Sequence, residues 1–273
     1  MSTIPSVDLG GDVTVPQLGF GVFQIPDDDV ERAVLQAFEL GYRHVDTAAI
    51  YRNERGVGRA VAASGLPREE VFVTTKLWND AQGRESAPRA LADSLQRLGL
   101  EYVDLYLIHW PAPQRELYAE TWEALLELQQ EGLARAVGVS NFQPAHLERI
   151  IEATGVSPAI NQVELHPWLQ QAPLRAFCAE RRIAIEAWSP LAQGRLDDPV
   201  LSSIAKAYDK SVAQVVLRWH VQLGNVVIPK SATPSRIAEN ADLFDFALGD
   251  DEMARIAALD AGDRIGFDPD TFG

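Results

Sequence analysis

The sequence is poor in cysteine and in positive charge. A single cysteine in 273 residues, Cys178, rules out an intrachain disulfide and is typical of a reducing compartment, so we expect a cytoplasmic protein. Cys178 stands in the apolar helical pattern LRAFCAERR, which favours a buried thiol over a catalytic one. The formal net charge of -15 argues against nucleic acid or an anionic membrane as the partner, because both attract clustered positive charge.

Long apolar runs and the marks of a secreted chain are missing too. No apolar run approaches the roughly 20 residues that span a bilayer, and residues 1–13 lack a basic stretch followed by an apolar core. We therefore expect neither a membrane-spanning helix nor a signal peptide. No linker or low-complexity segment divides the chain, and its length suits one large α/β barrel, so a single domain over residues 1–273 is predicted.

Short β-rich runs alternate with amphipathic helical stretches along the chain. The expected strands cover residues 18–22, 44–48, 71–76, 103–109, 134–140, 159–164, 183–188 and 225–230. Expected helices between them include 28–41, 85–99, 119–132 and 211–224, each ending at a glycine that suits a left-handed C-cap. Eight strand–helix units in alternation predict a parallel sheet that closes into a (β/α)8 barrel.

The sequence near each end of the chain predicts a structure outside the strand–helix alternation. Residues 7–16, VDLGGDVTVP, place the Gly10-Gly11 turn between two short β-like arms. This pattern predicts a β-hairpin, which would cover the N-terminal mouth of the barrel. The stretch 261–273 is rich in Gly, Asp and Pro and is expected to form an irregular tail.

Four ionisable residues stand where expected strands end. Asp46 follows the apolar part of the second strand, Tyr51 lies in the loop after it, Lys76 closes the third strand and His109 the fourth. Taken singly, each has a structural explanation: a helix-capping acid, a loop aromatic, a solvated lysine and a packed histidine. Together they are expected to converge, because the C-terminal ends of barrel strands meet at one mouth, where catalytic residues lie.

These four side chains have a joint chemistry. A phenol ordinarily keeps its proton to pH about 10, and a buried Lys76 ammonium beside Tyr51 is expected to lower that pKa toward neutrality. Asp46 would pair with Lys76 and keep it charged despite burial. A neutral His109 would hydrogen-bond a carbonyl oxygen. The set includes no nucleophile and no metal cluster, and it suits delivery of a proton to an oxygen that gains negative charge when a carbonyl accepts a hydride.

A hydride donor has to bind without the glycine-rich dinucleotide fingerprint. The stretches GFG at 19–21 and GVG at 56–58 lack the third glycine and the strand–turn–helix setting. The last expected strand instead leads into IPKSATPSRIAEN, where Lys230 and Arg236 flank the start of a helix. Such a helix start attracts anions, and this loop is a common phosphate position in barrels. An ordinary capped helix with solvated charges is the alternative.

Seven motifs, in this order and spacing, resemble the aldo-keto reductases: GYRHVDTAAIYRNE, TTKLW, DLYLIHWP, GVSNF, NQVELHP, SPLAQG and IPKS. The resemblance covers nearly the whole chain and is closest to the bacterial 2,5-diketo-D-gluconate reductases. It implies an NADPH-dependent oxidoreductase that reduces small aldehydes, ketones or keto sugars, such as 2,5-diketo-D-gluconate or methylglyoxal, to alcohols. NADPH would give a hydride to the carbonyl carbon, and Tyr51 would protonate the oxygen. The residues that match the catalytic tetrad are Asp46, Tyr51, Lys76 and His109.

The resemblance also implies cofactor-binding and substrate-binding positions. Those for the nicotinamide carboxamide are Ser140, Asn141 and Gln162, and Trp188 would stack on the nicotinamide ring. The loop over the pyrophosphate would comprise Ser189, Pro190, Leu191, Gln193 and Gly194. The contacts to the 2′-phosphate would be Lys230, Ser231 and Arg236, and those to adenine Glu239 and Asn240. The substrate pocket would be lined by Phe23, Ala49, Ile50, Trp78, His109 and Trp110, with the tail near Phe267 as a lid.

Three residues depart from patterns common in the family. Phe23 stands where many relatives have tryptophan, and Trp188 replaces the tyrosine of the wider family. Thr233 stands where some diketogluconate reductases carry an additional arginine, and this difference is expected to weaken the contact with the 2′-phosphate. Because the tail is short, we expect an open pocket.

Two other functions stay open at this point. Barrels that resemble aldo-keto reductases also serve as non-catalytic NADPH-binding regulatory subunits of channels. A barrel glycosidase would use Glu164 and Glu186 as paired carboxylates, although both lie within strand sequence. For the reductase we predict a monomer whose partner is a small carbonyl substrate, with no nucleic acid, membrane or metal.

Overall fold

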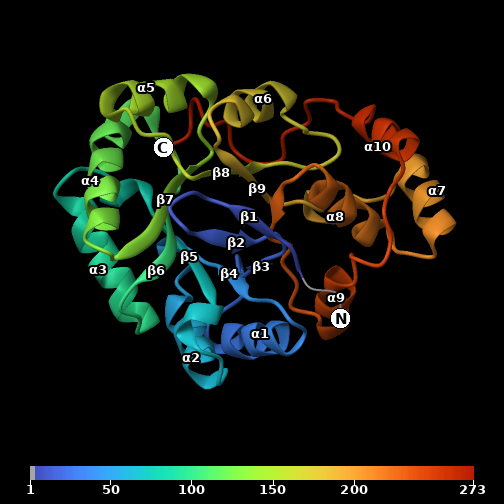
Figure 1. The fold of residues 1–273 in the computed structure, drawn as a ribbon, viewed down its shortest axis with the longest axis horizontal. Coiled ribbons are helices and arrows are strands. Elements are labelled where there is room, and N and C mark those ends of the chain that lie inside the picture. The colour runs from blue at the N-terminus through green and yellow to red at the C-terminus, as the bar shows by residue number, and fades with distance from the viewer. Residues whose placement is uncertain (1–3) are drawn as a thin grey trace.

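The computed structural model describes residues 4–273 and has the expected (β/α)8 architecture (Figure 1). Eight parallel strands form one sheet in the order β10-β9-β8-β7-β6-β5-β4-β3. Their bounds are Phe20–Gly21 (β3), His44–Asp46 (β4), Phe72–Leu77 (β5), Val103–Ile108 (β6), Ala134–Ser140 (β7), Ile160–Glu164 (β8), Ala184–Trp188 (β9) and Val226–Val227 (β10). A parallel bridge between Leu18 and Val227 joins the two ends of the sheet and closes the barrel.

Helices follow the strands and surround the barrel (Figure 1). The α-helices are Asp27–Glu39 (α1), Glu54–Ala63 (α2), Ser86–Leu98 (α3), Tyr118–Gln130 (α4), Pro144–Thr154 (α5), Ala172–Glu180 (α6), Pro199–Tyr208 (α7), Val212–Gln222 (α8), Pro234–Ala241 (α9) and Asp250–Ala257 (α10). Short 3-10 helices cover Ala49–Tyr51 (η1), Arg68–Glu70 (η2), Asn79–Ala81 (η3), Pro113–Arg115 (η4) and Ala192–Gly194 (η5). The amphipathic pattern explains their placement, since α1 buries Val30, Val34 and Phe38 on one face.

The N-terminal hairpin closes one end of the barrel, as predicted. Strands β1 (Ser6–Asp8) and β2 (Thr14–Pro16) pair antiparallel on either side of the Gly10-Gly11 turn, where both glycines have positive φ. Val13 and Val15 of this hairpin belong to a buried apolar cluster with Phe72 and Ile160, at the N-terminal ends of β5 and β8. The hairpin therefore covers the N-terminal ends of these strands, opposite the end where the candidate site residues lie.

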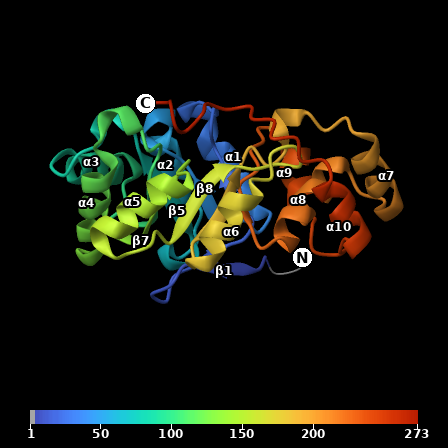
Figure 2. The ribbon, with the colours of Figure 1, turned by 90° about the horizontal axis from the view of Figure 1, so that it is seen from above.

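The C-terminal tail runs across that opposite mouth. Figure 2 shows the hairpin at one end of the barrel and the tail, in red, at the other. Residues 261–273 contain no helix or regular strand, as expected. The tail therefore contributes to the end of the barrel where the strand-end polar residues gather.

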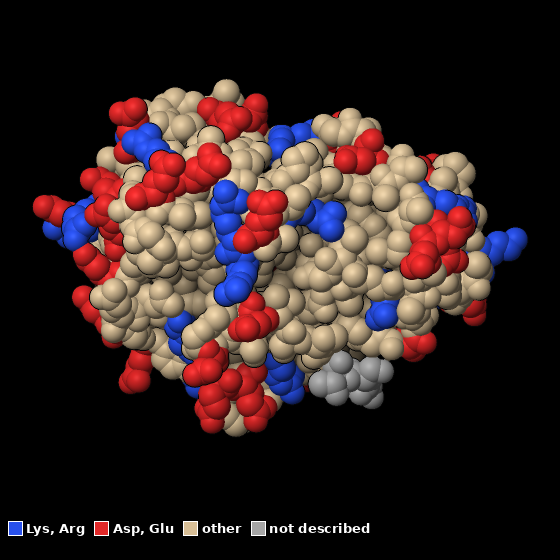
Figure 3. Space-filling view, turned by 45° about the horizontal axis from the view of Figure 1, so that its top comes forward, with Lys and Arg blue, Asp and Glu red and all other residues tan. Residues whose placement is uncertain are grey.

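The surface carries both signs of charge. In Figure 3 acidic and basic side chains are interspersed over the face drawn. No helix within residues 4–273 is both long and apolar enough to cross a membrane. Cys178 lies fully buried in α6, and burial raises the pKa of its thiol to about 11, as befits the structural role predicted for it.

Candidate active site

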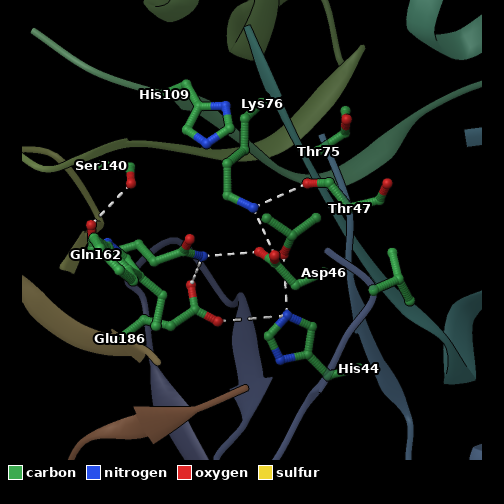
Figure 4. Close-up of polar contacts among 12 residues, drawn as sticks. His44, Asp46, Thr47, Thr75, Lys76, His109, Ser140, Gln162 and Glu186 are labelled. Atoms are coloured by element: carbon green, nitrogen blue, oxygen red, sulfur yellow. Dashed lines mark hydrogen bonds and ion pairs between the residues drawn. The ribbon is translucent and has the colours of Figure 1, made fainter. Parts of the chain in front are cut away.

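A buried ion pair forms the base of the mouth. Asp46 ends β4 opposite Thr74 of neighbouring β5, and Lys76 lies two residues beyond Thr74 on the same strand, so parallel pairing brings the two side chains close together. The Nζ of Lys76 is 2.5 Å from Oδ1 of Asp46 and donates to the backbone oxygen of Thr47 at 2.9 Å (Figure 4). Burial lowers the pKa of Lys76, but the charge of Asp46, its hydrogen bond to Lys76 and further contributions from neighbouring groups together outweigh burial, so the net pKa is raised. Lys76 is therefore an ammonium held in one place.

Tyr51 ends η1 and is half-buried close to this pair. The Nζ of Lys76 lies 5.1 Å from the centroid of the Tyr51 ring. Burial raises the pKa of Tyr51, and the charge of Lys76 lowers it only in part. The net decrease expected from the sequence is therefore wrong in sign, because loss of hydration outweighs the nearby cation. Tyr51 therefore holds its proton at neutral pH, with the ammonium of Lys76 beside its ring.

His109 directly follows β6 and faces the same space. Its ring centroid lies 5.7 Å from that of Tyr51 and 5.1 Å from that of Trp78. Burial and, to a lesser extent, Lys76 hold the pKa of His109 well below its usual value, so the imidazole is neutral. Its buried Nδ1 has no hydrogen-bond partner within residues 4–273. The structure thus brings all four tetrad candidates to one mouth.

Polar side chains also tie four neighbouring strand ends together. Ser140 Oγ donates to the backbone oxygen of Gln162 at 2.9 Å, and Asn141 Nδ2 donates to the backbone oxygen of His109 at 3.0 Å. The indole Nε1 of Trp188 donates to Oδ1 of Asn141 at 2.8 Å and so fixes the orientation of the half-buried indole ring. Asn141 has φ of 65°, a left-handed conformation that asparagine tolerates better than most residues.

Gln162 extends this network to two carboxyl groups. Its Nε2 donates to Oδ2 of Asp46 at 2.8 Å and to Oε2 of Glu186 at 2.7 Å (Figure 4). Both hydrogens of the amide nitrogen are thereby used. Its Oε1 accepts no hydrogen bond from any residue that the structure describes, and it remains available to a ligand.

The loop after β9 has unusual backbone geometry. Ser189, Ala192 and Gln193 have φ values of 47°, 47° and 55°, and Gln193 is exposed together with Gly194. Non-glycine residues in this region store conformational energy, and such strain is concentrated in ligand-binding loops. Of the other two predicted loop residues, Pro190 is buried and Leu191 half-buried.

The start of α9 presents two cations. Lys230 and Arg236 are exposed, and neither forms an ion pair within residues 4–273, although 39 residues of the chain are acidic. Ser231 is buried, and its Oγ accepts the backbone N–H of Thr233 at 3.0 Å. The predicted adenine contacts differ in exposure: Glu239 is half-buried, and Asn240 is buried.

Aromatic rings surround the mouth. The Phe23 ring is 4.9 Å from that of Tyr51, and it is 53% exposed. Trp110 packs against Phe272 of the tail at 4.7 Å, and Phe272 stacks on Phe267 at 4.3 Å. The tail thus supplies a wall through Phe272, which the sequence did not single out, and through the more exposed Phe267, whose ring centroid lies 6.3 Å from that of Trp110. The remaining predicted pocket residues, all half-buried at the same mouth, are Ala49, Ile50 and Trp78.

Sequence reasoning missed the role of three buried side chains. Glu164 accepts the backbone N–H groups of Ile265 and Gly266 and so anchors the tail. Glu186 and His44 lie against each other below Gln162, inside the barrel. A charged residue within an apolar strand is the signal that the sequence offers, and on its own it supports only the glycosidase alternative or a structural role. No group of three or more His, Cys, Asp or Glu side chains within residues 4–273 could hold a metal ion.

The chain resembles known proteins over almost its whole length. The aldo/keto reductase family matches residues 17–261. Methylglyoxal reductase DkgA of Escherichia coli is 54% identical over 263 residues, which cover 95% of this chain and 94% of that protein. An aldo/keto reductase structure from Brucella melitensis superimposes with a TM-score of 0.93 at 54% identity, covering 95% of this chain and 99% of that one. A mutant of Gox0644 in complex with NADPH superimposes with a TM-score of 0.96 at 46% identity and full coverage of both chains.

These likenesses far exceed what a shared fold alone produces, and they confirm the resemblance inferred from the seven motifs. The chain belongs to the aldo/keto reductase family.

Proposed function

We propose that this protein reduces the carbonyl groups of small aldehydes, ketones or keto sugars to alcohols with NADPH, and that Tyr51 is the general acid. The observation that carries the proposal is the buried Asp46–Lys76 ion pair next to a half-buried tyrosine at the open end of the barrel. Family membership supports the class of reaction, and the NADPH complex of Gox0644 supports the cofactor.

Tyr51 and Lys76 serve proton delivery, and His109 orients the substrate. When bound, NADPH supplies the hydride that the carbonyl carbon accepts. Tyr51 keeps its proton until the carbonyl oxygen gains negative charge and then donates it. Lys76, fixed by Asp46, stabilises the resulting phenolate by charge. Neutral His109 hydrogen-bonds the carbonyl oxygen and holds it facing Tyr51.

The residues present fit the cofactor. The free Oε1 of Gln162 suits the amide N–H of a nicotinamide carboxamide, and the fixed ring of Trp188 offers a flat face for stacking. The unpaired cations Lys230 and Arg236 at the start of α9 suit a 2′-phosphate, which NADH lacks.

Small polar carbonyl compounds are the proposed substrates. The relative from Escherichia coli is a methylglyoxal reductase, and the aromatic wall gives the pocket an apolar side opposite the polar tetrad. We further propose that residues 1–273 act as one domain and as a monomer in the cytoplasm.

The decisive experiment compares the wild type with Tyr51→Phe. NADPH oxidation is followed with methylglyoxal and a nitrobenzaldehyde, and NADPH binding is measured by quenching of tryptophan fluorescence. We expect kcat to fall by about 100-fold or more with little change in NADPH affinity, since the change removes one acidic proton. Most of kcat retained in Tyr51→Phe would contradict the role of Tyr51. A wild type that binds NADPH without turning over any carbonyl compound would favour a regulatory subunit instead.

A further inference from the structure

Glu186 is a buried carboxyl group that the mechanism above does not use. It lies in the middle of β9 with no exposed surface, and its side chain enters the barrel beneath the tetrad (Figure 4). Its Oε2 accepts the Nε2–H of Gln162 at 2.7 Å. Its Oε1 is buried and has no hydrogen-bond partner among the described residues. A negative charge on this oxygen would have no hydrogen-bond donor to stabilise it, and a buried uncompensated charge costs more than a buried neutral polar group.

The charges around Glu186 leave it without a cation of its own. From β5, Lys76 is committed to Asp46 and to a backbone oxygen. From β4, Asp46 adds a negative charge, and the Nε2 of His44 lies 3.7 Å from Oε1. Burial lowers the pKa of His44 to about 3, so this imidazole is neutral. The remaining elements contribute no charge at this level: β10 pairs Val226 with Glu186, and η1 contributes the uncharged phenol of Tyr51.

The carboxyl groups of Asp46 and Glu186 therefore have only the amide of Gln162 and the ammonium of Lys76 between them. If both were ionised, the buried cluster would carry an excess negative charge. Asp46 holds the direct contact to Lys76, so Glu186 is the member that keeps a proton. In agreement, burial and then the charge of Asp46 raise the pKa of Glu186 to about 8.

We propose that Glu186 is a positioning residue, a neutral carboxylic acid that locks the side-chain amide of Gln162 with its nitrogen toward the two carboxyl groups and its oxygen toward the mouth. The identity of the group that meets this oxygen rests on the proposed function: an amide N–H of the nicotinamide ring's carboxamide. Ionisation of Glu186 would place a second negative charge beside Asp46, and this charge raises the pKa of Tyr51 and makes its proton harder to release.

The protonation state can be measured on the protein without any ligand. Infrared difference spectra of wild type and Glu186→Gln at pH 6.5 should contain the carbonyl stretch of a protonated carboxyl group in the wild type only. Glu54→Gln is the matched control, because Glu54 is equally buried but binds Thr75 and Arg97 on the outer side of the barrel wall, away from the tetrad. The band must persist in that control. A wild type without the band, or a band that Glu186→Gln leaves intact, would overturn the proposal.

Binding then tests the orientation of Gln162. In Glu186→Gln the new amide still offers an oxygen to Gln162, so NADPH affinity should stay within about threefold of wild type. In Glu186→Leu this acceptor is gone, and the Kd should rise about tenfold, equivalent to one lost hydrogen bond. Equal affinity in Glu186→Leu and wild type would refute the positioning role. Circular dichroism checks that both variants fold.

The pH profile separates positioning from a purely structural role. In the wild type kcat/KM should decline as pH rises past about 8, where Glu186 ionises. Glu186→Gln has no such group, so its profile should lack this decline while activity at pH 7 persists. Identical profiles would count against the proposal. The infrared result does not depend on the proposed function, which fails instead if Tyr51→Phe remains active.

Discussion

Glu164, the last residue of β8, accepts a hydrogen bond at 2.8 Å from the backbone N–H of Gly266, which lies 102 residues further along the chain. The same carboxylate accepts the N–H of Ile265 at 2.7 Å, and Arg264 approaches it to 3.9 Å. Burial raises the pKa of Glu164, but hydrogen bonds from His166 and the two tail amides lower it below its usual value. An ionised strand-end carboxylate therefore holds the tail, with its aromatic residues, over the mouth of the barrel.

Removing this anchor should loosen the tail. In Glu164→Ala we expect the amides of Ile265 and Gly266 to exchange hydrogen about 10- to 100-fold faster, because each loses a hydrogen bond to a charged acceptor. Hydrogen-exchange mass spectrometry of residues 261–273 measures this. Exposed Glu152→Ala in α5 is the control and should leave the tail unchanged. Unaltered exchange in Glu164→Ala would show that the other contacts of the tail are enough to hold it.

The tail also depends on the absence of a side chain at Gly266. A Cβ at this position would lie 2.5 Å from Cη2 of Trp188 and 2.9 Å from Oε2 of Glu164. Gly266→Ala should therefore displace the tail or the indole, and it should raise the KM for NADPH several-fold if Trp188 moves. A changed tryptophan emission spectrum without cofactor would report the movement. An unchanged spectrum together with an unchanged KM would contradict this expectation.

The protein should be more stable with the Asp46–Lys76 pair intact, or with both charges removed, than with the charge of Asp46 left alone. Lys76→Met leaves the Asp46 charge buried near Glu186, and we expect a loss of about 3–5 kcal/mol in the free energy of unfolding. Adding Asp46→Asn removes that charge, so the double variant should be more stable than Lys76→Met alone. Urea denaturation of the three proteins gives the comparison. A double variant no more stable than Lys76→Met would indicate that the two charges do not interact.

The cations at α9 should discriminate between the two nicotinamide cofactors. Lys230→Ala and Arg236→Ala should each raise the KM for NADPH about tenfold, while the KM for NADH changes little, because only NADPH carries the 2′-phosphate. Added salt should weaken NADPH binding in the wild type more than in the variants. Arg55→Ala, an exposed cation on α2, serves as the control. Equal losses for both cofactors would place the 2′-phosphate elsewhere.

Glu186 should make the protein less stable as pH rises. The pKa of Glu186 is about 8 in the folded chain and about 4.5 for an exposed glutamate, as in the unfolded chain. Between pH 4.5 and pH 8 the folded protein therefore keeps the proton that the unfolded chain has lost. Unfolding then becomes easier with pH, by at most about 1.4 kcal/mol per pH unit from this group. The free energy of unfolding at pH 5, 6.5 and 8 should fall less steeply in Glu186→Gln than in wild type. Parallel curves for the two proteins would mean that Glu186 is ionised in the fold.

The sequence by itself determined the barrel and the place of the tetrad. Alternation of β-rich and helical segments is a local property, and it allows few topologies once right-handed crossovers are required. Strand ends could be predicted to within a few residues, so Asp46, Lys76 and His109 could be assigned to one mouth in advance. The hairpin could also be predicted from local sequence, because Gly10 and Gly11 specify its turn.

Only the tertiary structure decided how those groups ionise and what surrounds them. Burial, which no short motif encodes, raises the pKa of Tyr51 against the pull of Lys76 and keeps the proton on Glu186. The contact between Glu164 and Gly266 joins residues whose separation along the chain hides their proximity. Hydration and through-space contacts are set by the whole fold, and for that reason the charges of this site could not be derived from the order of its residues.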